Sequence, residues 1–296
     1  WHYMAEKLSA RGWQVITTSS QQNQALRLLD MLNTVYTQRH EYALAQIDVF
    51  SGKAFIYAEA CSQLLKWLGK PMVLTLHGGG LPEFAAKHPV RVKRLLQRAD
   101  AIVTPSPFLQ NSLREYAPDI RLINNPIDIS QGIYRQRSAV QPKLIWVRAF
   151  HEIYNPEMAL KVLAGLFSEF PESHLTMIGP VKSHVCMQSV RTLAKELHVE
   201  DHLEIITGVP HAEVSKFLDK ADIFLNTSNY DTAPRSILEA MLNGLCVVST
   251  NVGGIPYLGT NNQEFLLVPP GDHLAMANAI RRVLTEPELA SRLSSN

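Results

Sequence analysis

The sequence predicts an α/β protein made of two doubly wound domains with parallel sheets that face each other across a cleft. Short runs rich in aliphatic and β-branched residues alternate with helical patterns, and this alternation restarts after an aperiodic segment at residues 129–142. The 296 residues are also enough for two domains of about 150 residues each. We therefore place the domains at residues 1–135 and 136–296, with ligands expected at the carboxyl ends of the strands.

The composition of the chain argues against several classes of protein. Apolar residues make up 46% of the chain and charged residues 19%, which is typical of a globular protein and argues against disorder. A net charge of +1 provides no overall field for nucleic acid. No apolar run reaches the roughly 18 residues of a membrane span. Cys61, Cys186 and Cys246 lack the spacing of metal ligands or of a disulfide framework, so we expect buried thiols in a reducing, cytoplasmic compartment.

The amino-terminal half begins with a helical pattern over residues 1–11 that Gly12 ends, followed by a β-rich run at 13–18 that predicts a strand. Further elements alternate after it. Strands are expected at 44–47, 71–76, 101–104 and 121–123, and helices at 53–68, 89–98 and 106–116.

The carboxy-terminal half has a complete doubly wound pattern after the aperiodic segment. Strands are expected at 143–147, 174–178, 203–206, 223–226, 246–249 and 264–268, and helices at 156–170, 184–197, 211–220, 235–243 and 273–285.

The most informative stretch follows the strand at 223–226. After a polar loop, Pro234 is a favoured first residue of a helix. The free amides of Arg235, Ser236 and Ile237, at the positive end of the helix dipole, then predict a binding site for a phosphate or diphosphate. The Arg235 guanidinium can add a charge-assisted contact.

Two carboxylates bracket this anion site. Glu239 lies one turn further along the helix, where it can accept two hydrogen bonds from a vicinal diol such as a ribose, and Asp231 lies in the loop before the helix. The alternatives are that Asp231 caps the helix and that Glu239 is a solvated helix residue. Gly253 and Gly254 permit either a close backbone approach or an ordinary turn.

These motifs resemble the donor-site signature of retaining GT-B glycosyltransferases of family 4. The family pattern E-x7-E reads Asp231-x7-Glu239 here, followed by Ala240-Met241, Gly244 and Val252-Gly253-Gly254-Ile255-Pro256. Companion motifs occur in the family's order over nearly the whole chain: Leu76-His77-Gly78-Gly79, Ala99-Asp100-Ala101, Asn125-Pro126-Ile127-Asp128, Ile206-Thr207-Gly208, Ala221-Asp222-Ile223 and Leu267-Val268-Pro269-Pro270-Gly271-Asp272. The fold that the resemblance implies is GT-B, with two Rossmann-like domains.

The resemblance also implies roles by position. Glu239 would bind the nucleotide ribose, Asp231 and His77 would contact the donor sugar, and Arg148 would neutralise the diphosphate. Gly208 is grouped with Arg235, Ser236 and Ile237 as donor-binding. Where the family has a second cation, a lysine, this chain reads Glu152-Ile153-Tyr154. A structural hydrogen bond for His77 and a surface salt bridge for Arg148 are the alternatives.

The predicted function is transfer of a sugar from a nucleoside-diphosphate donor to a carbohydrate or lipid-linked acceptor, with retention and without a metal or other cofactor. The chain contains no Asp-x-Asp motif, so the helix amides and Arg148 would stabilise the leaving diphosphate. Alternatives are a non-catalytic two-domain binding protein and a nucleotide-sugar epimerase of the same fold. The sequence gives no code for the donor base, the sugar or the acceptor.

Two further expectations concern a surface and the chain ends. Arg91, Arg94 and Arg98 share a helical face that could attract anionic lipid, at the inner face of a membrane; an ordinary solvated face is the alternative. Because the chain starts at Trp1 inside a helical pattern and stops inside another after Leu289, we expect the native protein to have a strand before the first and a helical segment after the second.

Overall fold

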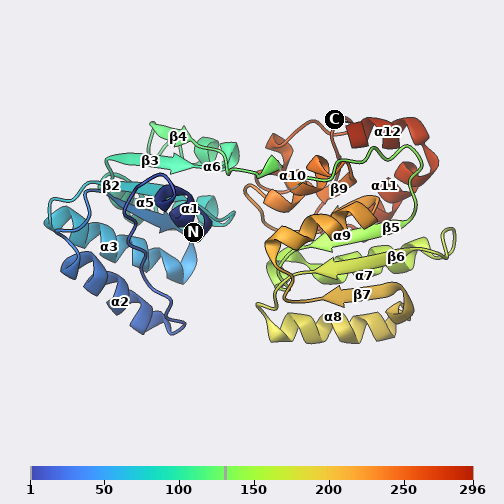
Figure 1. Ribbon diagram of the computed structural model, residues 1–296, viewed down its shortest axis with the longest axis horizontal. Coiled ribbons are helices and arrows are strands. Elements are labelled where there is room, and N and C mark those ends of the chain that lie inside the picture. Colours follow the sequence, from blue (N-terminus) through green and yellow to red (C-terminus); the bar gives the residue numbers. More distant parts are fainter. Residues whose placement is uncertain (1, 130–131, 296) are drawn as a thin grey trace. The chain divides into compact units, whose positions relative to one another are not determined.

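The computed structural model describes residues 2–129 and 132–295, and the chain divides into two compact units, residues 1–124 and 125–296. Each unit is an α/β structure around a parallel sheet, as predicted (Figure 1). The division falls after Asn124, whereas the sequence suggested residue 135. Ser130 and Gln131 of the expected linker lie outside the described residues.

The first unit is built around a parallel sheet whose described strands have the order β1-β2-β3-β4. The register pairs the buried Ile47 with the buried Leu74, and Leu74 with the partly buried Ile102, so aliphatic side chains of one core align across the sheet. In chain order the elements are α1 (His2–Ser9), α2 (Gln24–Thr37), β1 (Ala45–Val49), α3 (Phe55–Trp67), β2 (Met72–Leu76), α4 (Leu81–Lys87), α5 (Pro89–Leu96), β3 (Ala101–Thr104), α6 (Pro107–Ser112) and β4 (Ile120–Leu122).

The strand predicted at residues 13–18 is wrong. Residues 13–20 have no regular structure, and Trp13 is 67% exposed. A strand needs a partner for its backbone groups, and among the described strands β1 pairs only with β2. The sequence analysis also missed helix α2, although Asn23 caps it by accepting hydrogen bonds from the amides of Ala25 and Leu26.

The second unit is a doubly wound sheet whose described strands have the order β10-β9-β8-β5-β6-β7, all parallel. The chain moves from β5 outward through β6 and β7, then returns to β8 and moves outward the other way, so the order reverses between β5 and β8. The elements are β5 (Lys143–Val147), η3 (Glu152–Tyr154), α7 (Pro156–Leu166), β6 (His174–Ile178), α8 (His184–Glu196), η4 (Glu200–His202), β7 (Leu203–Ile206), η5 (His211–Glu213), α9 (Val214–Lys220), β8 (Ile223–Asn226), α10 (Arg235–Leu242), β9 (Cys246–Thr250), η6 (Ile255–Tyr257), β10 (Leu266–Val268), α11 (His273–Thr285) and α12 (Pro287–Ser295).

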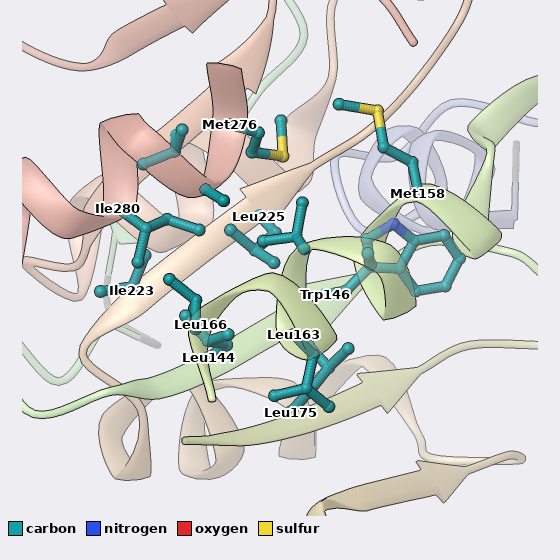
Figure 2. Packing of buried hydrophobic residues seen from close by; sticks show 14 of the residues in the cluster. Leu144, Trp146, Met158, Leu163, Leu166, Leu175, Ile223, Leu225, Met276 and Ile280 are labelled. Carbon is teal, nitrogen blue, oxygen red and sulfur yellow. The ribbon is translucent and has the colours of Figure 1, made fainter. Parts of the chain in front are cut away.

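The two faces of this sheet carry separate apolar cores. Figure 2 shows one of them, where Leu163 and Leu166 of α7 and Met276 and Ile280 of α11 pack against side chains of β5 and β8. On the other face, α9 and α10 pack over the sheet. Burial on both faces explains why the central strands read as continuous apolar runs.

Residues 132–142, predicted to be part of a linker, are bound to the second unit. The Arg137 side chain is fully buried and donates hydrogen bonds to the backbone carbonyls of Asn243 and Ala221. Its backbone amide donates to Ser294 Oγ, and the amide of Ile133 donates to Asn243 Oδ1. Residues 132–142, which we call the strap, lack hydrophobic periodicity because polar contacts hold them to the second unit.

Candidate functional site

The loops at the carboxyl ends of β5 and β8, where the strand order reverses, are fastened to each other. Thr227 Oγ1 donates to the carbonyl of Tyr154 at 2.8 Å and accepts from Trp146 Nε1 at 2.9 Å. The amide of Asn229 donates to the carbonyl of Ile153 at 2.8 Å. These contacts give the predicted site residues a rigid base.

Arg148 and Asp231 come together at this edge. Arg148 follows β5 directly, its Nη2 forms an ion pair with Asp231 Oδ2, and its guanidinium lies over the ring of Tyr154 at 5.0 Å. The other Asp231 oxygen accepts the amide of Thr232 at 2.9 Å. Burial raises the pKa of the Asp231 carboxyl, and the charge of Arg148 opposes that shift. The alternative that Asp231 caps α10 is wrong, because the N-cap is Pro234 and no side chain accepts from the first amides of this described helix.

The Asp231 loop is held against the turn after β9 by backbone contact. A Cβ atom on Gly253 would lie 2.0 Å from the carbonyl oxygen of Asp231, and Gly253 has a φ of +53°. The amide of Gly254 donates to the same carbonyl at 2.9 Å. The glycine pair therefore serves a close backbone approach, one of the two roles that the sequence allowed.

The first turn of α10 and Arg148, the residue after β5, carry buried donors without acceptors. The Nε atoms of Arg148 and Arg235 and the Oγ atom of Ser236 are buried and have no hydrogen-bond partner within the described part of the chain. Ser236 is 8% exposed, and Ile237 is fully buried in the core beneath the helix, so only its backbone amide could serve a ligand. Buried donors without partners are rare in proteins, so these three atoms are candidates for contact with a ligand or with water.

Glu239 lies one turn further along α10 and is not a solvated helix residue, since its side chain is 16% exposed. Its Oε1 lies 3.0 Å from His211 Nε2 and 3.5 Å from Arg235 Nη2. The three side chains border a small cavity that Ser215 and Asn243 also line. Sequence reasoning missed His211; the available signal was Gly208, whose φ of +78° turns the chain between β7 and η5.

His77 lies in the first unit, directly after β2. Its Nε2 is 3.4 Å from Asp48 Oδ1, and its ring stacks on Phe50 with centroids 5.4 Å apart. Burial raises the pKa of the Asp48 carboxyl, while His77 lowers it. Sequence reasoning missed Asp48, which the register of β1 and β2 places beside the histidine.

Two of the three arginines predicted to form a lipid-binding face have contacts within the first unit. Arg91 pairs with Glu59 of α3 at 2.5 Å, and Arg98 donates to the carbonyl of Glu59 and to Ser62 Oγ. Arg94 is exposed. Among the described residues, no helix combines the length and apolar character that crossing a membrane requires.

Comparison with known protein families shows the family to which the chain belongs. Residues 134–296, more than half of the chain, match the family described as Glycosyl transferases group 1, and residues 1–131 match Glycosyltransferase Family 4. The chain belongs to the group 1 glycosyltransferase family.

Curated relatives of this group 1 glycosyltransferase are distant. Glycogen synthase of Mycobacterium tuberculosis is 24% identical over 259 residues, covering 83% of this chain and 62% of the relative. D-inositol 3-phosphate glycosyltransferase of Corynebacterium glutamicum is 27% identical over 144 residues, covering 48% and 34%. The chain thus spans less than two thirds of the length of these relatives.

Solved structures of the GT-B class have the same fold. Sucrose-phosphate synthase from Thermosynechococcus elongatus matches with a TM-score of 0.78 at 21% identity, covering 95% of this chain and 74% of that one. Anabaena Alr3699/HepE, solved in complex with UDP-glucose, matches with a TM-score of 0.79 at 17% identity, covering 99% and 82%. The predicted two-domain α/β fold is therefore confirmed.

Proposed function

We propose that this chain transfers a sugar from a nucleoside-diphosphate donor to a carbohydrate or lipid-linked acceptor. The observation that carries the proposal is the set of three buried, unpartnered donors: those of Arg235 and Ser236 in the first turn of α10, and that of Arg148, whose ion-pair partner Asp231 lies in the loop before this helix. Together with the helix dipole and two positive charges, they offer what a diphosphate requires.

The same groups would assist the chemistry. In the transfer, the bond from the anomeric carbon to the diphosphate breaks and a bond to the acceptor oxygen forms, while the acceptor proton passes to the diphosphate. Negative charge grows on the leaving group, and preorganised donors stabilise it most in the transition state. We propose that Arg148, Arg235 and the amides of Ser236 and Ile237 do this without a metal ion, and that the acceptor attacks on the departure face, which gives retention.

The remaining site residues receive roles around this diphosphate. Glu239 would accept hydrogen bonds from the ribose diol, Asp231 would contact hydroxyls of the donor sugar, and His77 would contact the same sugar. Gly208 would shape the turn beside the nucleoside. The complex of Anabaena HepE with UDP-glucose makes UDP-sugars the first donors to test.

The test is release of nucleoside diphosphate from UDP-, GDP- and ADP-sugars mixed with candidate acceptors, with and without a metal chelator. We expect release that the chelator leaves unchanged, and a product whose anomeric configuration, followed by NMR, matches that of the donor. Glu239→Ala should weaken nucleotide binding about ten- to a hundredfold, because hydrogen bonds to a charged group contribute about 1.5–3 kcal/mol. Glu196→Ala, at an exposed position of α8, is the matched control.

The outcome also separates the alternatives. Tight nucleotide-sugar binding without release for any donor and acceptor would indicate a binding protein instead of a transferase. Interconversion of the free donor into an epimer would indicate an epimerase. Unchanged affinity in Glu239→Ala would remove this residue from the site.

A further inference from the structure

His211 is placed beside Glu239 by the local course of the chain. The chain leaves β7 at Ile206, turns at Gly208 with a φ of +78°, and enters the short helix η5 at His211. Helix α9 follows directly and returns over the sheet toward β8. The turn at Gly208 therefore places His211 on the face of the sheet that α9 and α10 cover.

Packing then fixes the distance between the two helices. Val214 and Leu218 of α9 share one buried core with Ile237 and Ala240 of α10. Because close-packed cores resist sliding, the backbone at His211, three residues before Val214, stays near Glu239, two residues after Ile237. The imidazole itself is 60% exposed, and its contact with Glu239 orients it.

The contacts of the Glu239 carboxylate are asymmetric. His211 Nε2 lies 3.0 Å from Oε1, and Arg235 Nη2 lies 3.5 Å from the same oxygen. For Oε2 the described residues provide no hydrogen bond or ion pair. An ionised carboxylate only accepts hydrogen bonds, so His211 Nε2 carries the proton that it donates. The shorter of the two contacts is the one from His211.

We propose that His211 is a positioning residue for nucleotide binding: it holds Oε1 of Glu239 so that Oε2 faces the ribose diol. This inference rests on the proposed function, because it takes the ligand to be a nucleoside diphosphate. A glutamate that is fixed in advance loses less side-chain freedom when it binds the ribose. His211 itself does not touch the reacting atoms.

The test compares ribose and deoxyribose nucleotides by calorimetry. UDP, GDP and ADP are titrated into the wild-type protein, and the one that binds is compared with its 2′-deoxy form. We expect the wild type to prefer the ribose form about tenfold, since the lost hydroxyl leaves a charged acceptor unsatisfied. In His211→Asn, whose side chain is too short to reach Oε1, the preference should fall to about twofold, with a higher KM for the donor and little change in kcat.

Two variants act as controls. His211→Gln should restore most of the preference, because its amide nitrogen can take the place of Nε2. His198→Asn replaces an exposed histidine at the end of α8 whose φ of +53° asparagine tolerates, and should leave binding unchanged. A merely structural effect of His211→Asn would weaken both nucleotides equally.

The outcomes distinguish the two proposals. If the wild type binds none of the nucleoside diphosphates, the proposed function fails, and the role of His211 fails with it. If the wild type binds and His211→Asn keeps the full ribose preference, only the role of His211 is overturned. A reduced preference that His211→Gln restores supports the proposal.

Discussion

Arg148 makes two side-chain contacts and still keeps one donor atom without a partner in the described structure. Its ion pair with Asp231 uses Nη2, and its ring contact with Tyr154 supports the guanidinium face, while Nε stays without a partner in the described structure. Tyr154 lies in the segment Glu152-Ile153-Tyr154, where the family resemblance predicts a lysine. An aromatic ring therefore supports the Arg148 guanidinium from this segment and adds no charge of its own.

The three cysteines lead to a prediction about reactivity. Burial raises the pKa of Cys61 and Cys186 to about 11 and that of Cys246 to about 12. Because the thiolate is the reactive form, a pKa of about 11 leaves roughly one thiol in a thousand ionised at pH 8. We expect negligible reaction with a disulfide reagent in the native protein at pH 8 and full reaction of all three in denaturant. Rapid native labelling would contradict the buried positions.

At the residue scale, the sequence predicted candidate site residues but not the side chains that contact them. The amide-rich helix start, Glu239 and Asp231 follow from local spacing, and so they could be predicted. His211 and Asp48 could not, because their contacts join residues 28 and 29 positions apart and depend on helix packing and on strand register. Position alone suggested that Arg148 neutralises a phosphate; only the structure shows its pair with Asp231.

At the scale of elements, the loops after β5, β8 and β9 are fastened to one another. Side-chain and backbone hydrogen bonds join the first two, and the Gly253 contact joins the second to the third. The proposed anion site would therefore depend on the loop after β9, to which we assign no ligand group.

Gly253→Ala tests this dependence. We expect the free energy of unfolding to fall by more than the roughly 1–2 kcal/mol that a left-handed conformation costs alanine, because the new methyl meets the Asp231 carbonyl. Nucleotide affinity should fall as well, since the Asp231 loop must move. The matched control is Gly271→Ala, which has a φ of +77° and open space around its Cβ, and should show only the conformational cost. Equal losses in denaturant unfolding of both variants would contradict the close-contact role.

Most elements followed from periodicity, and the exceptions have physical reasons. The β-rich run at 13–18 has the composition of a strand but no partner among the described strands. Helix α2 was not predicted, although Leu28, Met31, Leu32 and Val35 recur at helical spacing. Met31, Leu32 and Val35 pack against the core, whereas Leu26 and Leu29 are 54% and 63% exposed. The pattern was strongest in the second unit, where strands such as β8 and β9 are buried on both faces.

At the scale of the whole molecule, the two units have separate cores. Buried residues of the first unit form one cluster, and those of the second form two clusters, one on each face of its sheet. Residues 132–142, the strap, are fastened to the second unit by Arg137; burial lowers the pKa of its guanidinium, and nearby Asp222 opposes that shift. The stability of this strap should therefore be a property of the second unit.

Arg137→Ala should destabilise the second unit selectively. The substitution leaves the backbone carbonyls of Asn243 and Ala221 without their buried donor and removes the cation 3.5 Å from Asp222, and breaking a buried ion pair costs about 3–5 kcal/mol. Urea unfolding can be followed separately in each unit, by labelling of the buried Cys246 in the second and of the buried Cys61 in the first. We expect the Cys246 transition to move to lower urea while the Cys61 transition stays in place. Arg135→Ala, which removes a half-exposed guanidinium from the same strap, should have a much smaller effect. Equal shifts of the transitions in both units would show that they unfold together, and no shift in either would show that the strap contributes nothing to stability.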